Sequence, residues 1–325
     1  MSDSPPSPPL ALLGPQRLRP RLDEACTALG VDGPVAVITA GWEEREGEDD
    51  ELVSHLGGRP ATNLRLYERA ERLFEAHPEL LDDHRQRRDR RAALRRLYRI
   101  RLAHALDAVR ELRARDSRIP DAHRALYETA CADATRAVHQ LDAEHLDRTF
   151  EITHDPAHPP LAETHPAVAA ERDELAALID SSAAVGIAGG NVRIILDVLR
   201  LFSLAPLLRA RPVMAWSAGA MALSETIVLF HDSPPQGPGN AEVHAPGLDF
   251  HRGLVLLPHA RRRLRLDDPA RVALFAQRFA PSTCLALDDG ASLILRDDRL
   301  ERATAAHQLR TDGTVVPFVI PEGAP

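Results

Sequence analysis

Short apolar runs that end at glycines constrain the fold of this chain more than any other feature. The run 35–39 is followed by Gly41, and the run 184–188 ends at Gly189 and Gly190. Helix-compatible segments separate these runs, and strands that alternate with helices predict a mostly parallel sheet with helices on both faces. Function in such sheets gathers at the carboxyl ends of the strands, so the residues that follow each run are the first candidates for a site.

The pattern changes between residues 63 and 148, where glycine is absent and apolar residues recur at helical spacing. Pro78 and Pro120 divide this block into three expected helices, near 64–77, 79–115 and 120–148. We therefore predict a three-layer α/β core interrupted by an all-helical insertion that caps a cleft or forms the interface of a homodimer. The expected parts are 1–62, the first part of the core with a disordered N-terminus, 63–148, the insertion, and 149–325, the second part of the core with the catalytic residues.

Composition excludes several classes of function. The chain of 325 residues has a net charge of −8, which argues against a nucleic-acid binder, and every basic residue is Arg, which excludes lysine Schiff-base chemistry and a P-loop lysine. Cys26, Cys131 and Cys284 are too dispersed for a disulfide framework or a zinc site, so a cytoplasmic location is expected. Residues 1–9 lack the features of a signal peptide, and no apolar run reaches membrane-spanning length.

Ser217 stands where a strand is expected to turn into a helix. The apolar run 212–214 precedes it, and Ala218, Gly219 and Ala220 follow it. A nucleophile elbow needs such small neighbours because its turn is strained and approaches both substrate and backbone, although Ala215 replaces the first glycine of G-x-S-x-G. The alternative is a serine that caps an alanine-rich helix with its hydroxyl.

A serine nucleophile needs a base and a group that orients the base. His259 follows the expected strand 254–257, and Asp232 follows the expected strand 226–230, so both are predicted at the strand edge that carries Ser217. The rival histidines, which we expect in exposed loops, are His231, His244 and His251.

An oxyanion hole requires preorganised backbone donors, and we expect the N–H groups of Gly190 and Ala218 to supply them. The alternative for Gly189-Gly190-Asn191 is an ordinary turn in which Asn191 caps the next helix. Neither G-x-G-x-x-G nor a Walker pattern is present to indicate a phosphate cradle.

Two charged segments have functional and structural interpretations. Residues 85–101 hold nine arginines and one aspartate, which fits either an anionic partner or, as we favour, a solvated face. The histidines and acidic residues between His154 and His165, including His158, could suggest a metal, but this proline-rich segment favours a polar loop, and no metal or other cofactor is expected.

These residues together resemble the serine peptidases that include aspartyl dipeptidase (peptidase E) and cyanophycinase. The resemblance is carried by Gly189-Gly190-Asn191, Trp216-Ser217-Ala218-Gly219-Ala220, Asp232 fifteen residues after the serine, and Pro258-His259. The segments 245–250 and 287–291 are similar to cyanophycinase segments, the second to its Ile-Asp-Glu-Asn-Thr. The resemblance covers roughly 171–320, with a weaker match over 8–42, and implies a class I glutamine-amidotransferase-like fold.

The resemblance implies that Ser217 is the nucleophile, His259 the base and Asp232 its orienter. It also assigns substrate binding to Asn191 and to Arg263 and Arg265, which match two of the three arginines that hold substrate in cyanophycinases. The alternative for the two arginines is a basic turn exposed to solvent, without a binding role. Asp268 stands at the third arginine position and Val192 replaces a glutamine, so cyanophycin is not the expected substrate.

We therefore predict a serine hydrolase that cleaves an amide bond in a small, Asp-containing, peptide-like substrate, with no nucleic acid or membrane partner. Glutamine amidotransfer is disfavoured because that chemistry uses cysteine at the elbow. The alternatives are an esterase or acyltransferase on the same fold, and a non-catalytic protein that binds through the arginine-rich helix.

Overall fold

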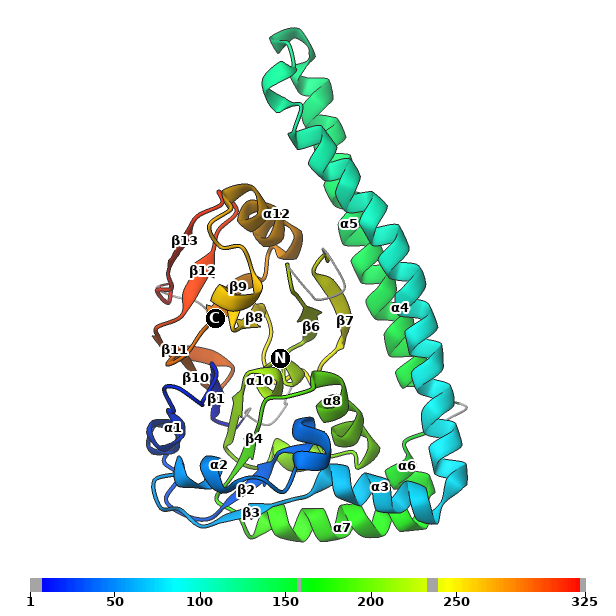
Figure 1. Ribbon diagram of the computed structural model, residues 1–325, viewed down its shortest axis with the longest axis vertical. Coiled ribbons are helices and arrows are strands. Elements are labelled where there is room, and N and C mark those ends of the chain that lie inside the picture. Colours follow the sequence, from blue (N-terminus) through cyan, green and yellow to red (C-terminus); the bar gives the residue numbers. More distant parts are fainter. Residues whose placement is uncertain (1–7, 157–158, 233–238, 322–325) are drawn as a thin grey trace.

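The computed structural model describes residues 8–156, 159–232 and 239–321, so the proline-rich residues 1–7 and His158 lie outside the described part. The strands form a sheet with the order β11-β10-β1-β5-β4-β2-β3, a second sheet with the order β13-β12-β9-β8, and the hairpin β6-β7 (Figure 1). The segment of the first sheet from β1 to β3 is parallel, whereas β10 and β11 join it antiparallel. The strands are β1 (Leu10–Leu13), β2 (Val35–Ile38), β3 (Ala61–Asn63), β4 (Ala184–Ile187), β5 (Val213–Trp216), β6 (Thr226–Leu229), β7 (Glu242–Pro246), β8 (Leu254–Pro258), β9 (Thr283–Leu287), β10 (Ser292–Arg296), β11 (Arg299–Thr304), β12 (His307–Leu309) and β13 (Val315–Pro317).

Prolines and capping residues define several helix starts. Pro78, Pro166 and Pro269 occupy first-turn positions, where a missing N–H is tolerated, and the Asn191 and Asp268 side chains accept hydrogen bonds from the first turns of their helices. The α-helices are α1 (Leu22–Leu29), α2 (Asp50–Ser54), α3 (Leu66–Ala76), α4 (Pro78–Arg113), α5 (Arg124–Thr153), α6 (Leu161–Thr164), α7 (Pro166–Asp180), α8 (Val192–Leu201), α9 (Ala205–Leu208), α10 (Ala218–Ala222), α11 (Ala260–Arg263) and α12 (Pro269–Phe279), and short 3-10 helices span Ala40–Arg45, Asp116–Arg118 and Asp121–His123.

Helices cover both faces of the large sheet because successive strand residues point to opposite sides. Leu13, Val37 and Trp216 pack with α1 and with Leu52 and Leu56 in and after α2 on one face. The alternate residues, such as Leu12, pack with α3, α7, α8, α9 and α10 on the other face. The predicted α/β class with a parallel-rich sheet is confirmed, while the class I glutamine-amidotransferase-like arrangement stays a prediction.

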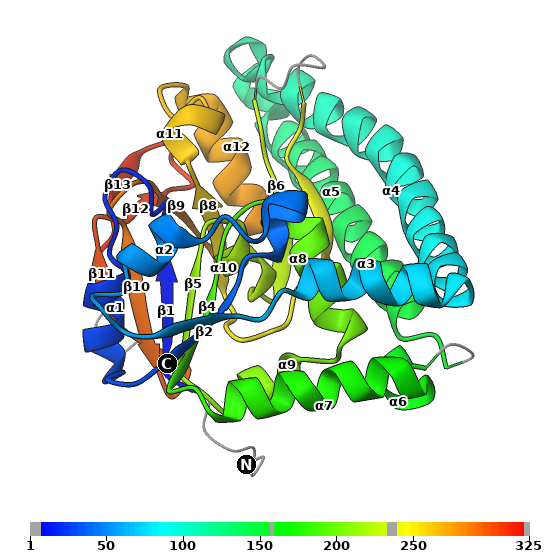
Figure 2. The same cartoon turned by 60° about the horizontal axis from the view of Figure 1, so that its bottom comes forward.

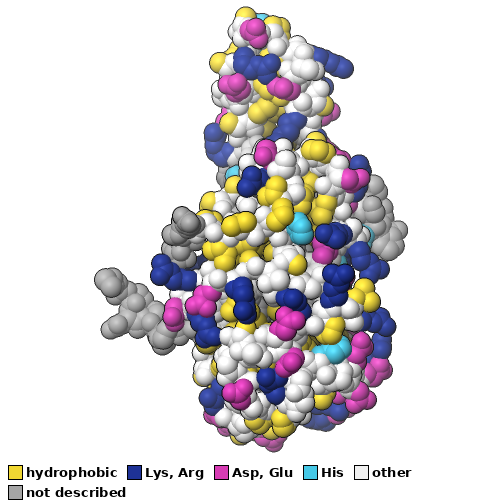
Figure 3. Space-filling view, turned by 90° about the vertical axis from the view of Figure 1, so that its left-hand side faces the viewer, with side chains coloured by type: hydrophobic (Ala, Val, Ile, Leu, Met, Phe, Trp, Pro, Cys, Tyr) yellow, Lys and Arg dark blue, Asp and Glu magenta, His cyan; other side chains and the backbone are white. Residues whose placement is uncertain are grey.

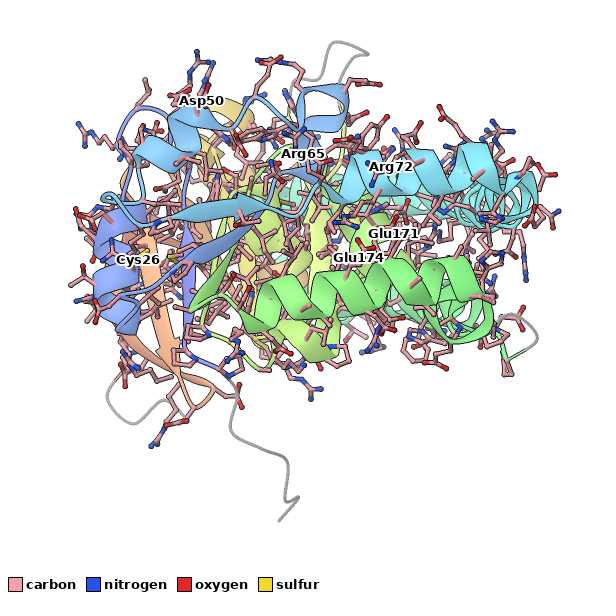
Figure 4. The ribbon with its side chains drawn as sticks, turned by 90° about the horizontal axis from the view of Figure 1, so that it is seen from below. Cys26, Asp50, Arg65, Arg72, Glu171 and Glu174 are labelled. Carbon is pink, nitrogen blue, oxygen red and sulfur yellow. The ribbon has the colours of Figure 1, made fainter. Side chains whose placement is uncertain are left out.

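The expected helical insertion contains one helix on the core and one long hairpin. α3 lies beside α7, and Arg72 of α3 points toward Glu171 of α7 (Figure 4). Arg69 is ion-paired with both Glu171 and Glu174, at 2.9 Å from Glu174. The helices α4 and α5 form an antiparallel hairpin whose far end projects beyond the sheets (Figure 1).

A buried polar network fastens this hairpin to the second half of the chain. Asp142 of α5 accepts hydrogen bonds from Nε and Nη2 of Arg278 in α12, at 2.7 and 2.8 Å, and from the Tyr98 hydroxyl of α4 at 2.7 Å. Tyr98 in turn accepts a bond from the backbone N–H of Val243 in β7. The His145 ring stacks on Tyr98 at a centroid distance of 4.0 Å, and burial lowers the pKa of His145 to about 4, so this imidazole stays neutral.

The outer surface carries charges of both signs. Acidic and basic side chains are interspersed over the face at the left of Figure 1, as Figure 3 shows. Figure 2 shows that α3 and α7 run beside each other from the sheet toward the hairpin. Within the described ranges, none of the helices combines the length and apolar character needed to cross a bilayer.

Replacing Asp142 with alanine tests the network that fastens the hairpin. The change leaves the buried guanidinium of Arg278 without a counter-ion, so we expect the free energy of unfolding to fall by about 3–5 kcal/mol in urea denaturation. Asp147→Ala, an exposed aspartate of the same helix, is the matched control and should change it little. Equal stability of the two variants would contradict a structural role for the network.

Candidate active site

Ser217 occupies a strained turn between β5 and α10. Its backbone has φ 50° and ψ −119°, a conformation that non-glycine residues rarely adopt and that carries strain of about 1–3 kcal/mol. The backbone N–H of Ser217 donates to the Leu13 carbonyl at the end of β1, which fixes the turn. The hydroxyl makes no capping hydrogen bond, so the alternative role as a helix cap is not observed.

Glycines around Ser217 allow the backbones of neighbouring strand ends to approach closely. A Cβ on Gly189 would lie 2.8 Å from the Ser217 Cβ, and one on Gly219 would lie 2.4 Å from the Ile187 carbonyl oxygen. Gly190 has φ 121°, and a Cβ there would lie 2.2 Å from the Gly41 carbonyl oxygen. These positions admit no larger residue without movement of the backbone.

The two amides predicted for the oxyanion hole donate no hydrogen bond within the described structure. Ala218 is the first residue of α10, so its N–H has no partner in the helix, and the Gly190 N–H is likewise unpaired. An ideal Cβ on Gly189 would lie 3.5 Å from the Ala218 nitrogen, which brings the glycine turn close to the Ala218 amide. Free donors from two neighbouring turns are what stabilisation of an oxyanion requires.

His259 lines the same cleft as Ser217. This active-site cleft has a volume of about 490 Å³ and is lined by Pro15, Gln16, Arg17, Leu22, Trp42, Arg45, Glu48, Glu51, Leu52, His55, Gly189, Gly190, Trp216, Ser217 and His259. His259 directly follows β8, in a left-handed conformation with φ 58°, and its N–H donates to Leu287 at the end of β9. The side chains of Ser217 and His259 share no hydrogen bond in the described structure; catalytic hydrogen bonds often tighten only when substrate binds.

Burial and nearby charges set the protonation of His259. Burial is the main cause that lowers the pKa of His259, and the positive charge of Arg263 lowers it further. The carboxylate of Asp289 acts to raise this pKa. Smaller effects come from Arg262, which lowers it, and from Asp288, which raises it. The imidazole is therefore neutral near pH 7, as a general base must be. Asp288 and Asp289 follow β9, whose end pairs with the end of β8, and this explains why their charges act on His259.

The structure does not join Asp232 to His259. One carboxylate oxygen of Asp232 pairs with Arg271 at 2.5 Å, and the other accepts the backbone N–H of Arg265 at 2.7 Å. Asp232 lines a separate small cavity beside α12 rather than the active-site cleft. The acidic groups that sequence reasoning passed over are Asp288 and Asp289, although the similarity of 287–291 to a cyanophycinase segment pointed to them.

The three residues expected to bind substrate lie outside the cleft lining. The Asn191 side chain accepts a hydrogen bond from the Arg193 N–H and so caps α8, which is the alternative role considered for it. It also donates to Glu43 at 3.1 Å. Arg265 pairs with Asp268 at 3.1 Å, and Arg263 is exposed on α11. The arginines that do line the cleft are Arg17 and Arg45, and Arg45 is ion-paired with Glu48.

The rival histidines have other partners. His251 is buried and lies 3.2 Å from the Ser224 hydroxyl, and His244 belongs to β7, so the expectation of exposed loops is wrong for both. His165 and His77 both lie beside Glu79. The Glu79 Oε1 atom is 3.5 Å from Nε2 of His165 and 3.3 Å from Nδ1 of His77. These three side chains have the donor types of a metal site, but their spacing equally fits ion pairing and they do not line the active-site cleft.

The region that holds Ser217 and His259 matches a known family. The model of peptidase family S51 matches residues 161–303, which include the elbow, His259 and Asp289. Residues 161–303 belong to peptidase family S51. The match to this family supports the interpretation of the chain as a serine peptidase. The matched region starts at residue 161, after the α4–α5 hairpin.

Solved structures of peptidases are also similar to this chain. A peptidase from an acI-B1 Actinobacterium aligns over 96% of this chain and 98% of its own, with 13% identity and a TM-score of 0.45. A putative peptidase E protein from Listeria monocytogenes EGD-e aligns over 41% of this chain and 65% of its own, with 14% identity and a TM-score of 0.30. No curated protein matches the chain.

The effect of Arg263 on His259 gives a prediction for the pH dependence of hydrolysis. Arg263→Gln removes a positive charge that lowers the His259 pKa, so the pKa should rise and the acid limb of kcat/KM should move to higher pH. Arg265→Gln is the control, since Arg265 is not among the main charges acting on His259. Unchanged pH profiles for both variants would show that His259 does not control the acid limb.

Proposed function

We propose that this S51 peptidase hydrolyses an amide bond in a small peptide-like substrate with a side-chain or terminal carboxylate next to the scissile bond. The observation that carries the proposal is that a strained serine, a neutral histidine and the unpaired Gly190 amide line one cleft, with the unpaired Ala218 amide next to the serine. Those are the groups needed to attack a carbonyl, move a proton and stabilise an oxyanion.

The proposed reaction passes through an acyl-enzyme. Ser217 Oγ bonds to the carbonyl carbon while its proton moves to His259, and the Gly190 and Ala218 N–H groups stabilise the oxyanion. The C–N bond then breaks, and the amine leaves with the proton from His259. Water attacks the ester in the same way, and the acid product and Ser217 are released.

A charge-stabilising role for Asp289, in place of the role assigned to Asp232 from the sequence, is the part of this proposal that departs from the sequence analysis. Asp289 follows β9, whose end pairs with the end of β8 before His259, and its negative charge acts to raise the pKa of His259, whereas both oxygens of Asp232 are engaged by Arg271 and Arg265. A carboxylate near the imidazole stabilises the imidazolium that forms during attack.

Replacing the two aspartates separately distinguishes these assignments. Asp289→Asn should lower kcat about 10³-fold or more with little change in KM, because the imidazolium loses its stabilising charge. Asp232→Asn should leave kcat within a few fold and lower thermal stability instead, because Arg271 loses its partner. The opposite pattern, with kcat lost in Asp232→Asn alone, would return the role to Asp232.

Arg17 is the proposed contact for the substrate carboxylate. It lines the active-site cleft and, among the described residues, its guanidinium has no hydrogen bond or ion pair, whereas Arg45 is neutralised by Glu48. An unpaired guanidinium can grip a carboxylate through two parallel hydrogen bonds.

The dipeptides Asp-Leu and Ala-Leu test the preference for an acidic group. Wild type should cleave Asp-Leu with the higher kcat/KM, and Arg17→Gln should reduce that preference at least tenfold by raising KM for Asp-Leu. Arg19→Gln, two residues away and outside the cleft lining, is the control. Ser217→Ala should abolish hydrolysis, and activity on p-nitrophenyl esters without any dipeptide cleavage would favour an esterase instead.

A further inference from the structure

A second cavity lies between the α4–α5 hairpin and the core, apart from the active-site cleft. It has a volume of about 350 Å³ and receives residues from α4, α5, α8 and β7. We call it the arginine cavity; its charged and polar lining consists of Arg88, Asp89, Arg91, Arg95, Thr149, Asn191, Arg193, Asp197, Arg200 and His244.

Positive charge is in excess around the arginine cavity. Arg91 is paired with Asp197 at 2.9 Å, and Asp89 is the remaining carboxylate of the lining. In the described ranges, no carboxylate forms an ion pair with the other arginines of the lining, which are Arg88, Arg95, Arg193 and Arg200. Asp197 and Glu242 act as nearby negative charges on Arg200 and Arg95, but the guanidinium groups outnumber these carboxylates. Guanidinium groups in such excess repel one another, and an anion placed among them would relieve this repulsion.

The guanidinium of Arg200 is only partly hydrogen-bonded. Its Nη2 donates to the Pro246 carbonyl at 2.8 Å, whereas its Nη1 is buried without a hydrogen-bond partner. Burial, followed by the charge of Arg91, lowers the pKa of Arg200 to about 10. Buried donors of native proteins are normally paired, so the unpaired Nη1 indicates a group that a partner would complete.

His244 is neutral and adds no further positive charge to these arginines. Burial lowers its pKa to about 3, and the positive charges of Arg193, Arg95, Arg91 and Arg200 act in the same direction. Its Nδ1 lies 3.4 Å from Nη1 of Arg95. Burial also lowers the pKa of Arg95, with Arg193 as the next cause, which is what crowding of like charges produces.

The N-terminus of α8 adds a further positive potential. Asn191 caps this ten-residue helix, and Asn191, Arg193 and Ile194 all line the cavity. The amino end of a helix carries a partial positive charge and favours anions.

Four other arginines of the 85–101 segment have acidic partners and fit the solvated-face interpretation. Arg87 pairs with Asp83, Arg90 with Asp155, Arg99 with Glu242 and Arg101 with Glu144. Arg85 and Arg96 have no ion pair among the described residues and lie outside the cavity lining, and Arg91 lines the cavity with Asp197 as its partner. A solvated face explains the arginines outside the lining, but it does not explain Arg88 and Arg95, which line the cavity without an acidic partner.

We propose that the arginine cavity binds a small molecule with two or more phosphate or carboxylate groups, at a site distinct from the Ser217 cleft. The volume is at the lower end of ordinary ligand pockets, which favours a small anion over a macromolecule. The ligand would contact α4 and α8 together and so hold the hairpin against the core. This site stands independently of the proposed peptidase reaction.

Binding of inorganic pyrophosphate and of citrate to the full chain, measured by calorimetry at constant ionic strength, tests the proposal and separates phosphate from carboxylate ligands. Wild type should bind at least one of them at one site, and Arg95→Gln and Arg193→Gln should each weaken that binding at least tenfold. Arg90→Gln, on the same helix but paired with Asp155, is the control and should bind as wild type does. Ser217→Ala should also bind normally, so loss of peptidase activity and loss of this site are distinguishable.

Thermal unfolding without added anion gives a second measurement. Arg95→Gln and Arg193→Gln should raise the Tm because each removes a repelling charge, whereas a purely structural role for these arginines predicts a lower Tm. The proposal is overturned if neither probe binds wild type at millimolar concentration, or if both variants bind pyrophosphate and citrate as tightly as wild type.

Discussion

The close approach of backbones at the strand ends is the constraint on which the candidate site depends. Gly189 and Gly219 let the turns after β4 and β5 lie almost in contact, and Gly190 lets the turn after β4 approach Gly41 after β2. No side chain fits at any of these three positions. The contact between the turns after β4 and β5 sets the Ser217 hydroxyl and the Ala218 amide beside the glycine turn and holds the serine in a strained conformation. The surrounding core must supply the stability that keeps such a turn in place.

The N-terminus of α8 connects the two cavities. Gly190 belongs to the active-site cleft, and its neighbour Asn191 belongs to the arginine cavity. Asn191 also donates to Glu43, whose own φ of 58° is unusual, so the turn that holds the Gly190 amide is fixed from several sides. A ligand that held α4 against α8 would therefore act one residue away from the proposed oxyanion hole.

Sequence reasoning succeeded where local pattern decides structure. The buried strands β2, β4 and β5 follow from their apolar runs. The three helices of the insertion were expected within a few residues of their bounds, except that α5 runs from 124 to 153 rather than 120 to 148. The strands β3, β7, β11 and β12 were not expected, because they are short or carry charged residues and depend on pairing with neighbours.

The partners of charged groups could not be predicted in the same way. Asp232 follows a strand as expected, but its carboxylate accepts a hydrogen bond from Arg271, which lies 39 residues further along the chain. Arg278 and Asp142 are 136 residues apart, and nothing in their local sequence marks them as a buried pair. The division of the arginine-rich segment into paired and unpaired residues also depends on α8 and β7, which pack against it only in the folded chain.

The position of the hairpin in the connection between β3 and β4 has an evolutionary consequence. β3 is the edge strand of the large sheet, so the chain leaves the sheet there and returns before β4 without passing between paired strands. The Tyr98–Asp142 contact lies roughly 22–27 Å along the helices from their far end. Beyond that contact α4 still reaches the core, through hydrogen bonds of Arg110 with Asn240 and of Arg113 with Gln277. Matched insertions or deletions in residues 114–123, which join the two helices past those contacts, would change the reach of the hairpin while leaving every strand pairing intact, so its length can diverge there among relatives that share the catalytic core.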